Sequence, residues 1–176
     1  MFFPAELTWN SEVDIHAACC LLRQTFESTT TREAYETLFR MHGMIESSSG
    51  KPVRIAGRLL PRWPSILESR IAQYWKRLPD DNFQIYYNHS KSCPGFNILA
   101  YACSGRRTSL ATLRAGLTIL DELAILAGDK AIVCQSINPR LNGRILEHFG
   151  FVQHATHLKG KHYIKRLESD FADKRF

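Results

Sequence analysis

A nearly continuous apolar run, residues 131–137, most constrains what this chain can fold into. Such a run, without a regular alternation of polar and apolar residues, is typical of a strand that is buried on both faces. The preceding residues, 108–127, carry apolar side chains at helical spacing, and Gly128 stands where the C-terminal cap of a helix belongs. A long helix that leads into a fully buried strand predicts a sheet covered by helices.

The residues after this strand predict a second, shorter helix. Asn138 can cap it, with Pro139 at the first helical position, where the missing N–H costs nothing. Leu141, Ile145 and Phe149 are its core-facing positions, and Gly150 ends it.

Four more strands are predicted around these helices. They cover residues 83–88, 96–103, 151–156 and 161–167. The last two form a closing hairpin that turns at Gly160.

The first 80 residues are predicted to be mainly helical. The first helix has apolar positions from Val13 to Phe26, and the third covers residues 65–77. The second carries Tyr35, Leu38, Phe39 and Met41 or His42, and it runs out in the serines and glycine of 47–50. Between the second and the third helix, residues 51–64 mix basic residues with prolines and predict an irregular segment.

Length and composition predict one domain over residues 1–176, with a core over 83–167 and a charged tail over 168–176. No apolar run approaches the roughly 18–20 residues that cross a bilayer, and the first ten residues lack the pattern of a signal peptide. Five cysteines without a CxxC pair favour reduced thiols in the cytoplasm. The net charge of +6 fits either ordinary solubility or an anionic ligand.

The order of elements resembles the core of the GNAT-type N-acetyltransferases, most closely over residues 96–167. The resemblance rests on the turn Gly105-Arg106-Arg107, on Asn138-Pro139 and on Gly150-Phe151. It implies an α+β fold with a GNAT-like central mixed β-sheet, helices on both faces and a helical N-terminal segment. It also implies an extra first strand, for which residues 2–8 are the candidate.

The resemblance implies acetyl-CoA as co-substrate. In that family two central parallel strands splay apart and hold the pantetheine arm between them, and here these strands would be 96–103 and 131–137. The pyrophosphate would lie on the turn that follows the first of them, at the positive end of the next helix. The residues implied in cofactor binding are Gly105, Arg106, Arg107, Thr108, Ser109, Asn138, Arg140 and Asn142. A solvated connecting loop and ordinary helix caps explain the same residues, and the family's usual glycine pattern in the turn is not present.

The sequence offers several candidates for a catalytic residue. Many family members carry a tyrosine four residues before the Gly-Phe pair, to protonate the departing thiolate, and that position here is Leu146. The candidates to replace it are Tyr163, His148, His162 and Tyr101, each of which also fits a structural role.

Two other kinds of site were weighed. A metal site among His148, His154, His157 and His162 is not expected, because residues three apart on a strand point to opposite faces. The basic stretch 51–63, with Arg54, Arg58, Arg62 and Trp63, suits nucleic acid. The expected function is transfer of an acetyl group to the amine of an unknown acceptor. The alternative is a weakly active or inactive module of the same fold that recognises nucleic acid or a protein through 51–63.

Overall fold

The structure, a computed structural model, describes residues 6–9, 13–27, 42–57, 78, 80–89, 93–136 and 141–167. Its strands are β1 (Glu6–Thr8), β2 (His42–Ser48), β3 (Lys51–Gly57), β4 (Asn82–His89), β5 (Phe96–Ser104), β6 (Ala131–Gln135), β7 (Val152–His154) and β8 (His162–Arg166). Its helices are α1 (Ile15–Glu27), α4 (Leu110–Leu126) and α5 (Gly143–His148).

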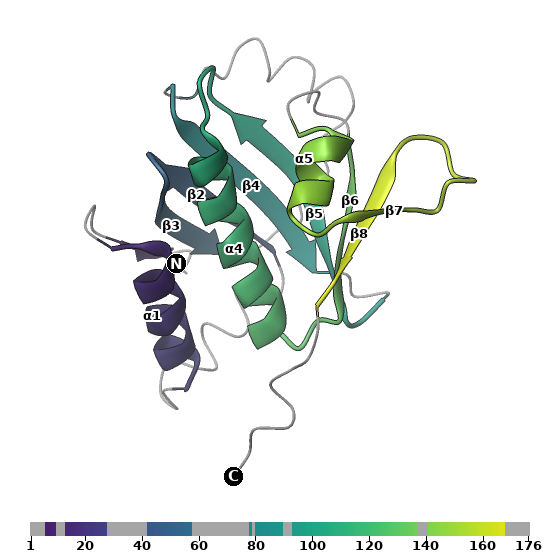
Figure 1. Ribbon diagram of the computed structural model, residues 1–176. Coiled ribbons are helices and arrows are strands. Elements are labelled where there is room, and N and C mark those ends of the chain that lie inside the picture. The colour runs from purple at the N-terminus through teal and green to yellow at the C-terminus, as the bar shows by residue number, and fades with distance from the viewer. Residues whose placement is uncertain are drawn as a thin grey trace, which may run out of the picture.

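The strands form one mixed sheet in the order β1-β3-β2-β4-β5-β6-β8-β7 (Figure 1). Every neighbouring pair is antiparallel except β5 and β6, which are parallel and are connected through α4. A parallel pair needs such a crossover, because the chain must return to the same end of the sheet. The predicted α+β fold with a central mixed sheet is therefore confirmed.

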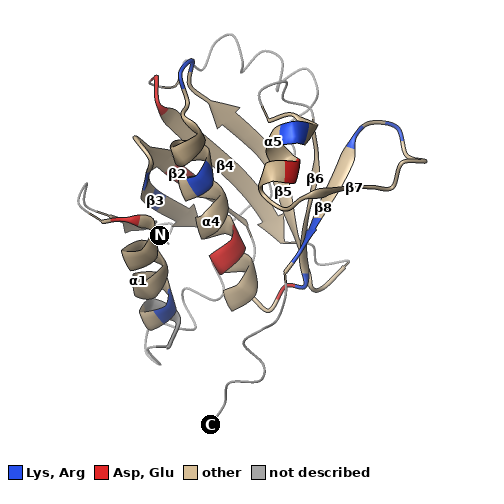
Figure 2. Ribbon diagram, in the orientation of Figure 1, with Lys and Arg blue, Asp and Glu red and all other residues tan. Residues whose placement is uncertain are grey.

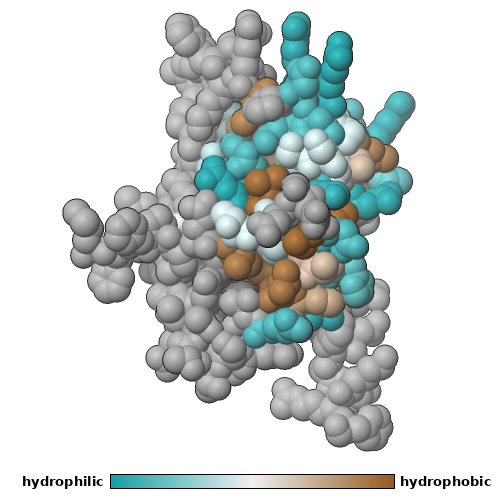
Figure 3. Space-filling model, turned by 90° about the vertical axis from the view of Figure 1, so that its left-hand side faces the viewer, coloured by the Kyte–Doolittle hydropathy of each residue, from teal (hydrophilic) through white to brown (hydrophobic). Residues whose placement is uncertain are grey.

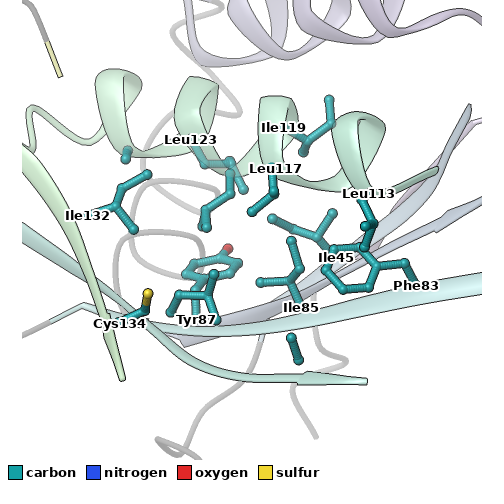
Figure 4. Packing of buried hydrophobic residues seen from close by; sticks show 14 of the residues in the cluster. Ile45, Phe83, Ile85, Tyr87, Leu113, Leu117, Ile119, Leu123, Ile132 and Cys134 are labelled. Atoms are coloured by element: carbon teal, nitrogen blue, oxygen red, sulfur yellow. The ribbon is translucent and has the colours of Figure 1, made fainter. Parts of the chain in front are cut away.

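Helix α4 forms the core together with the face of the sheet that it crosses. Its leucines point onto side chains of β2 and β4, among them Ile45, Phe83 and Ile85 (Figure 4). Gly116 allows this close approach, because a Cβ atom there would lie 3.0 Å from both the Phe83 ring and Ser47 Oγ. The helix ends as predicted at Gly128, whose φ of +77° suits glycine.

Helix α1 lies beside α4 on the same face of the sheet (Figure 1). Arg23 on α1 donates from Nε and Nη2 to the two carboxylate oxygens of Glu122 on α4, with 3.0 Å between Nη2 and Oε2. Figure 3 shows this side of the molecule, where apolar side chains gather around the middle of the face. Among the described residues, no helix is long and apolar enough to cross a bilayer.

The region around residues 42–57 corrects the prediction. The second helix was expected to reach Met41 or His42 and to run out in 47–50, and 51–64 was expected to be irregular. Instead β2 and β3 form a hairpin over 42–57. The two residues of its turn, Ser49 and Gly50, have φ values of 52° and 77°, the backbone that a two-residue hairpin turn requires.

Ser47 and Pro52 explain why the sequence did not predict this hairpin. Ser47 is buried, and its hydroxyl donates to Thr112 O of α4 at 2.8 Å, so it belongs to the core. Pro52 stands where the register between β2 and β3 shifts, a place where a strand tolerates proline. The candidate first strand in 2–8 is confirmed by β1, which pairs with β3. The helix predicted over 65–77 and most of the second helix lie outside the described residues.

Candidate functional site

Strands β5 and β6 pair over only part of their length. Their register runs from Phe96 opposite Ala131 to Leu99 opposite Cys134. Beyond that point β5 continues to Ser104, whereas β6 ends at Gln135. The second half of β5 therefore runs beyond the end of β6.

A β-bulge marks the point where the pairing with β6 ends. On the other side of β5, Tyr101 pairs with Tyr86 and Leu99 pairs with Tyr87, so that Ala100 is the extra residue. A bulge bends its strand and increases its local twist. This irregularity therefore bends β5 just beyond its last pair with β6.

A cavity of about 290 Å³ opens at the end of β5, beyond its last pair with β6. It lies between the turn after β5, the start of α4 and the start of α5. Four of its lining residues are apolar side chains and four belong to the turn; they are Phe83, Leu113, Leu141, Ile145, Ser104, Gly105, Arg106 and Thr108. The cavity thus joins an apolar wall to a basic turn.

The turn after β5 is held in place by the turn that precedes β4. Gly105 N donates to Asn82 O at 2.8 Å, and Arg107 N donates to Asp80 O at 2.9 Å. The Thr108 hydroxyl also donates to Asn82 O, at 2.9 Å. Arg106 and Arg107 are exposed. Figure 2 shows this basic turn at the top of the molecule, beside the acidic turn that Asp80 and Asp81 form before β4.

Helix α4 begins with a cap that involves a carboxylate. Ser109 is the N-cap residue, and its hydroxyl accepts from Thr112 N at 3.1 Å. Ser109 N donates in turn to Asp81 Oδ1 at 2.8 Å. Partial burial alone would raise the pKa of Asp81, but the hydrogen bonds from Ser109 and Thr112 outweigh it and lower that pKa.

Helix α5 begins later than the sequence analysis predicted. Its first residue is Gly143 rather than Pro139, and its N-cap is Asn142, whose side chain accepts from Ile145 N at 3.2 Å. Gly150 follows its C-terminal end with a φ of +83°, as expected. Residues 137–140, and with them the candidates Asn138 and Arg140, lie outside the described residues.

Two neighbouring apolar residues of α5, Ile145 and Leu146, point in different directions. Leu141 and Ile145 line the cavity, whereas Leu146 is fully buried in the core. The position at which the resemblance implies a tyrosine is therefore a packing position in this chain. Tyr163 of β8 is buried against the same helix, with its hydroxyl so close to Gly143 that a Cβ atom there would overlap it.

The other catalytic candidates are scattered. His148 is exposed at the end of α5, with its ring edge-on to Phe149. His162 lies in β8 near the hairpin turn, with Nε2 3.1 Å from Lys159 O. Tyr101 lies on the second half of β5, with its ring 6.0 Å from that of Tyr86. None of the four candidates is among the residues that line the cavity.

The structure thus brings together one part of the predicted site. Gly105, Arg106 and Thr108 line the cavity, Arg107 is in the same turn, and Ser109 caps the helix that follows. The sequence analysis missed Asp81 and the apolar wall. Asp81 lies in none of the elements predicted from the sequence, and its partner Ser109 is 28 residues further along the chain.

The rival sites also have a place in the structure. In the basic stretch, residues 51–57 are strand β3, and Arg54 Nε donates to Glu46 Oε2 at 2.7 Å, so that a carboxylate balances its charge. Arg58, Arg62 and Trp63 lie outside the described residues. Within the part of the chain that the structure describes, no three His, Cys, Asp or Glu side chains are grouped so that they could hold a metal ion.

Comparisons with known proteins add little. No protein-family model matches the chain, and no curated protein matches it. A crystal structure from Desulfovibrio desulfuricans is similar, with 14% identity and a TM-score of 0.44 over 94% of this chain and 99% of that one. Its assignment to the GNAT family of acetyltransferases is itself provisional. The strand order and pairing define the fold of the chain independently of this similarity.

Proposed function

We propose that this protein binds acetyl-CoA between β5 and β6 and transfers the acetyl group to an amine. The observation that carries the proposal is the partial pairing of the two parallel strands, which ends at Leu99 and Cys134 although β5 continues to Ser104. The second half of β5, which extends past the end of β6, is where a GNAT-type protein would hold the pantetheine arm.

The other parts of the ligand would follow from this placement. The pantetheine arm would lie along the second half of β5 and reach the cavity at its end. There the apolar wall would contact the arm, and the basic turn would lie next to the phosphates. Arg106 and Arg107 are exposed on the same turn and would neutralise the phosphates.

The chemistry requires few side chains. The amine nitrogen attacks the thioester carbonyl carbon and the C–S bond breaks. The nitrogen loses one proton to give the amide, and the CoA sulfur leaves as a thiolate that takes up a proton. Proximity and polarisation of the carbonyl supply most of the acceleration for such a transfer. Because no Tyr or His is among the described residues that line the cavity, we expect a slow enzyme that lacks the factor of about 10²–10⁴ from general acid catalysis.

Calorimetric titration with acetyl-CoA tests the cofactor. The wild type should bind it, and replacing Arg106 and Arg107 by Ala should weaken binding by about tenfold or more, because two charge-assisted contacts to phosphate are lost. Arg166→Ala is the matched control, since this exposed arginine lies on β8 opposite Ala131, where β5 and β6 are still paired. Absence of binding by the wild type at millimolar acetyl-CoA would rule the proposal out.

A non-catalytic version of the same module is the second candidate. Its supporting observation is the burial of Leu146 together with an apolar wall at Leu141 and Ile145. Incubation with acetyl-CoA and a panel of primary amines, followed by mass spectrometry of the products, separates the two. Acetylated amine above the uncatalysed background supports the enzyme, and binding without any product supports the module.

A further inference from the structure

The acidic turn before β4 is in direct contact with the turn on which the phosphates would lie. Asp81 accepts a hydrogen bond from Ser109 N at 2.8 Å on Oδ1, and Ser109 Oγ lies 3.3 Å from Oδ2. Both contacts are at the N-terminal end of α4, where the helix dipole favours a negative charge. The chain therefore places one of its own anions where an anionic ligand would otherwise be stabilised.

Two N–H groups of the turn after β5 already donate hydrogen bonds within the chain. The N–H groups of Gly105 and Arg107 donate to the carbonyl oxygens of Asn82 and Asp80. Backbone N–H groups are the donors that usually cradle a pyrophosphate at a helix start. Fewer of them are therefore left for a ligand, and a carboxylate beside them would repel one.

We infer that Asp81 is a specificity-determining residue, which lowers the affinity of the site for the phosphates of CoA and leaves its affinity for the pantetheine part unchanged. This inference rests on the proposed function. The phosphates are then held by the side chains of Arg106 and Arg107 rather than by the backbone. Thioesters of pantetheine, which carry no phosphate, are bound nearly as well as those of CoA.

The test is a titration of the wild type and Asp81→Asn with acetyl-CoA and with S-acetylpantetheine. Asparagine keeps an oxygen that accepts from Ser109 N and removes the charge. Asp81→Asn should bind acetyl-CoA about three- to tenfold more tightly, as expected for removing one like charge near the surface. Its affinity for S-acetylpantetheine should equal that of the wild type, and the gain should shrink at high ionic strength.

Asp80→Asn is the matched control, since Asp80 is exposed and contacts the turn through its backbone oxygen. It should raise the affinity for acetyl-CoA less than Asp81→Asn does. An equal gain from both variants, or no gain from Asp81→Asn, would overturn the inference while leaving the proposed function intact. If neither variant nor the wild type binds either ligand, the proposed function fails as well. Asp81→Ser, which also retains an acceptor, repeats the test should Asp81→Asn fold poorly.

Discussion

At the scale of single residues, two tyrosine hydroxyls are packed against glycines. Tyr87 is fully buried beneath α4, its hydroxyl has no hydrogen-bond partner among the described residues, and burial raises its pKa. A Cβ atom at Gly43, on the neighbouring strand, would overlap this hydroxyl. Tyr163 stands in the same relation to Gly143 of α5. In both places the glycine is required by the volume of a ring, not by an unusual backbone.

Removing the hydroxyl of Tyr87 should not destabilise the protein. Because a buried donor without a partner is unfavourable, we expect Tyr87→Phe to leave the free energy of unfolding unchanged or to raise it by about 1 kcal/mol. Urea denaturation of the two proteins measures the difference. A clear decrease in the free energy of unfolding of Tyr87→Phe would mean that the hydroxyl has a hydrogen-bond partner.

Gly143→Ala should destabilise the protein although alanine is the better helix former. The new methyl group would overlap the Tyr163 hydroxyl, and forced repacking of this kind costs about 1–3 kcal/mol. Urea denaturation should show this loss of stability. The double variant Gly143→Ala/Tyr163→Phe is the control, because it removes the overlapping oxygen and should recover part of the loss. If Tyr163→Phe gives no recovery, the two residues are not in conflict.

At the scale of elements, the orientation of α5 decides what this site can do. Ile145 and Leu146 are adjacent in the sequence, yet one lines the cavity and the other is fully buried. Since successive residues on a helix are about 100° apart, only one of the two can point at a ligand. The helix therefore presents the apolar side chain of Ile145 to the cavity. Leu146, at the position where the family that the sequence resembles usually has a tyrosine, is buried in the core.

Placing a tyrosine at each of these two positions should lower stability by different amounts. Leu146→Tyr enlarges a fully packed side chain, and we expect a loss of about 1–3 kcal/mol in the free energy of unfolding. Ile145→Tyr can extend into the cavity, so its cost should stay within about 1 kcal/mol. Chemical denaturation of both variants checks the contrast. Equal stabilities would show that the two faces of α5 do not differ in this way.

At the scale of the whole molecule, the acidic turn joins three parts of the fold. The side chain of Asp81 accepts from the N–H of Ser109, the N-cap of α4. Its carbonyl oxygen accepts from Ser48 Oγ at 2.9 Å and from Ser49 N at 3.1 Å, and β4 begins at the next residue. The turn thus connects the β2–β3 hairpin, the long helix and the centre of the sheet. The charge on Asp81 should for this reason contribute to global stability as well as to ligand choice.

The pH dependence of stability follows from the direction of this shift. The pKa of Asp81 is lower in the folded protein than its ordinary value of 3.8, so its contribution is complete above that value and is lost as the pH falls through the folded pKa. We expect the wild type to be more stable than Asp81→Asn at pH 6. Denaturant unfolding at successively lower pH should show this difference shrinking below about pH 4. A difference that stays constant down to pH 2 would contradict the assignment, since both side chains are then neutral.

The sequence by itself determined the elements whose signals are local. The periodic leucines of α4, the glycines at positions 128 and 150 and the apolar strands β4 and β5 all have the predicted type, because burial on one face and a left-handed cap leave direct marks in the sequence. The hairpin over 42–57 was not predictable in the same way. Its serine-rich turn and Pro52 are typical of a linker in the sequence. They belong to a hairpin because β2 pairs with β3 and Ser47 bonds to helix α4.

Only the tertiary structure decided where the candidate site lies and what limits it. The end of the pairing between β5 and β6, the direction of Leu146 and the contact of Asp81 with Ser109 all join residues that are far apart in the sequence or depend on the phase of a helix. A sequence marks which residues prefer a helix, a strand or a cap. Which strands stay paired and which carboxylate reaches a helix end depend on long-range packing, since that packing fixes the distances on which electrostatic and hydrogen-bond energies depend.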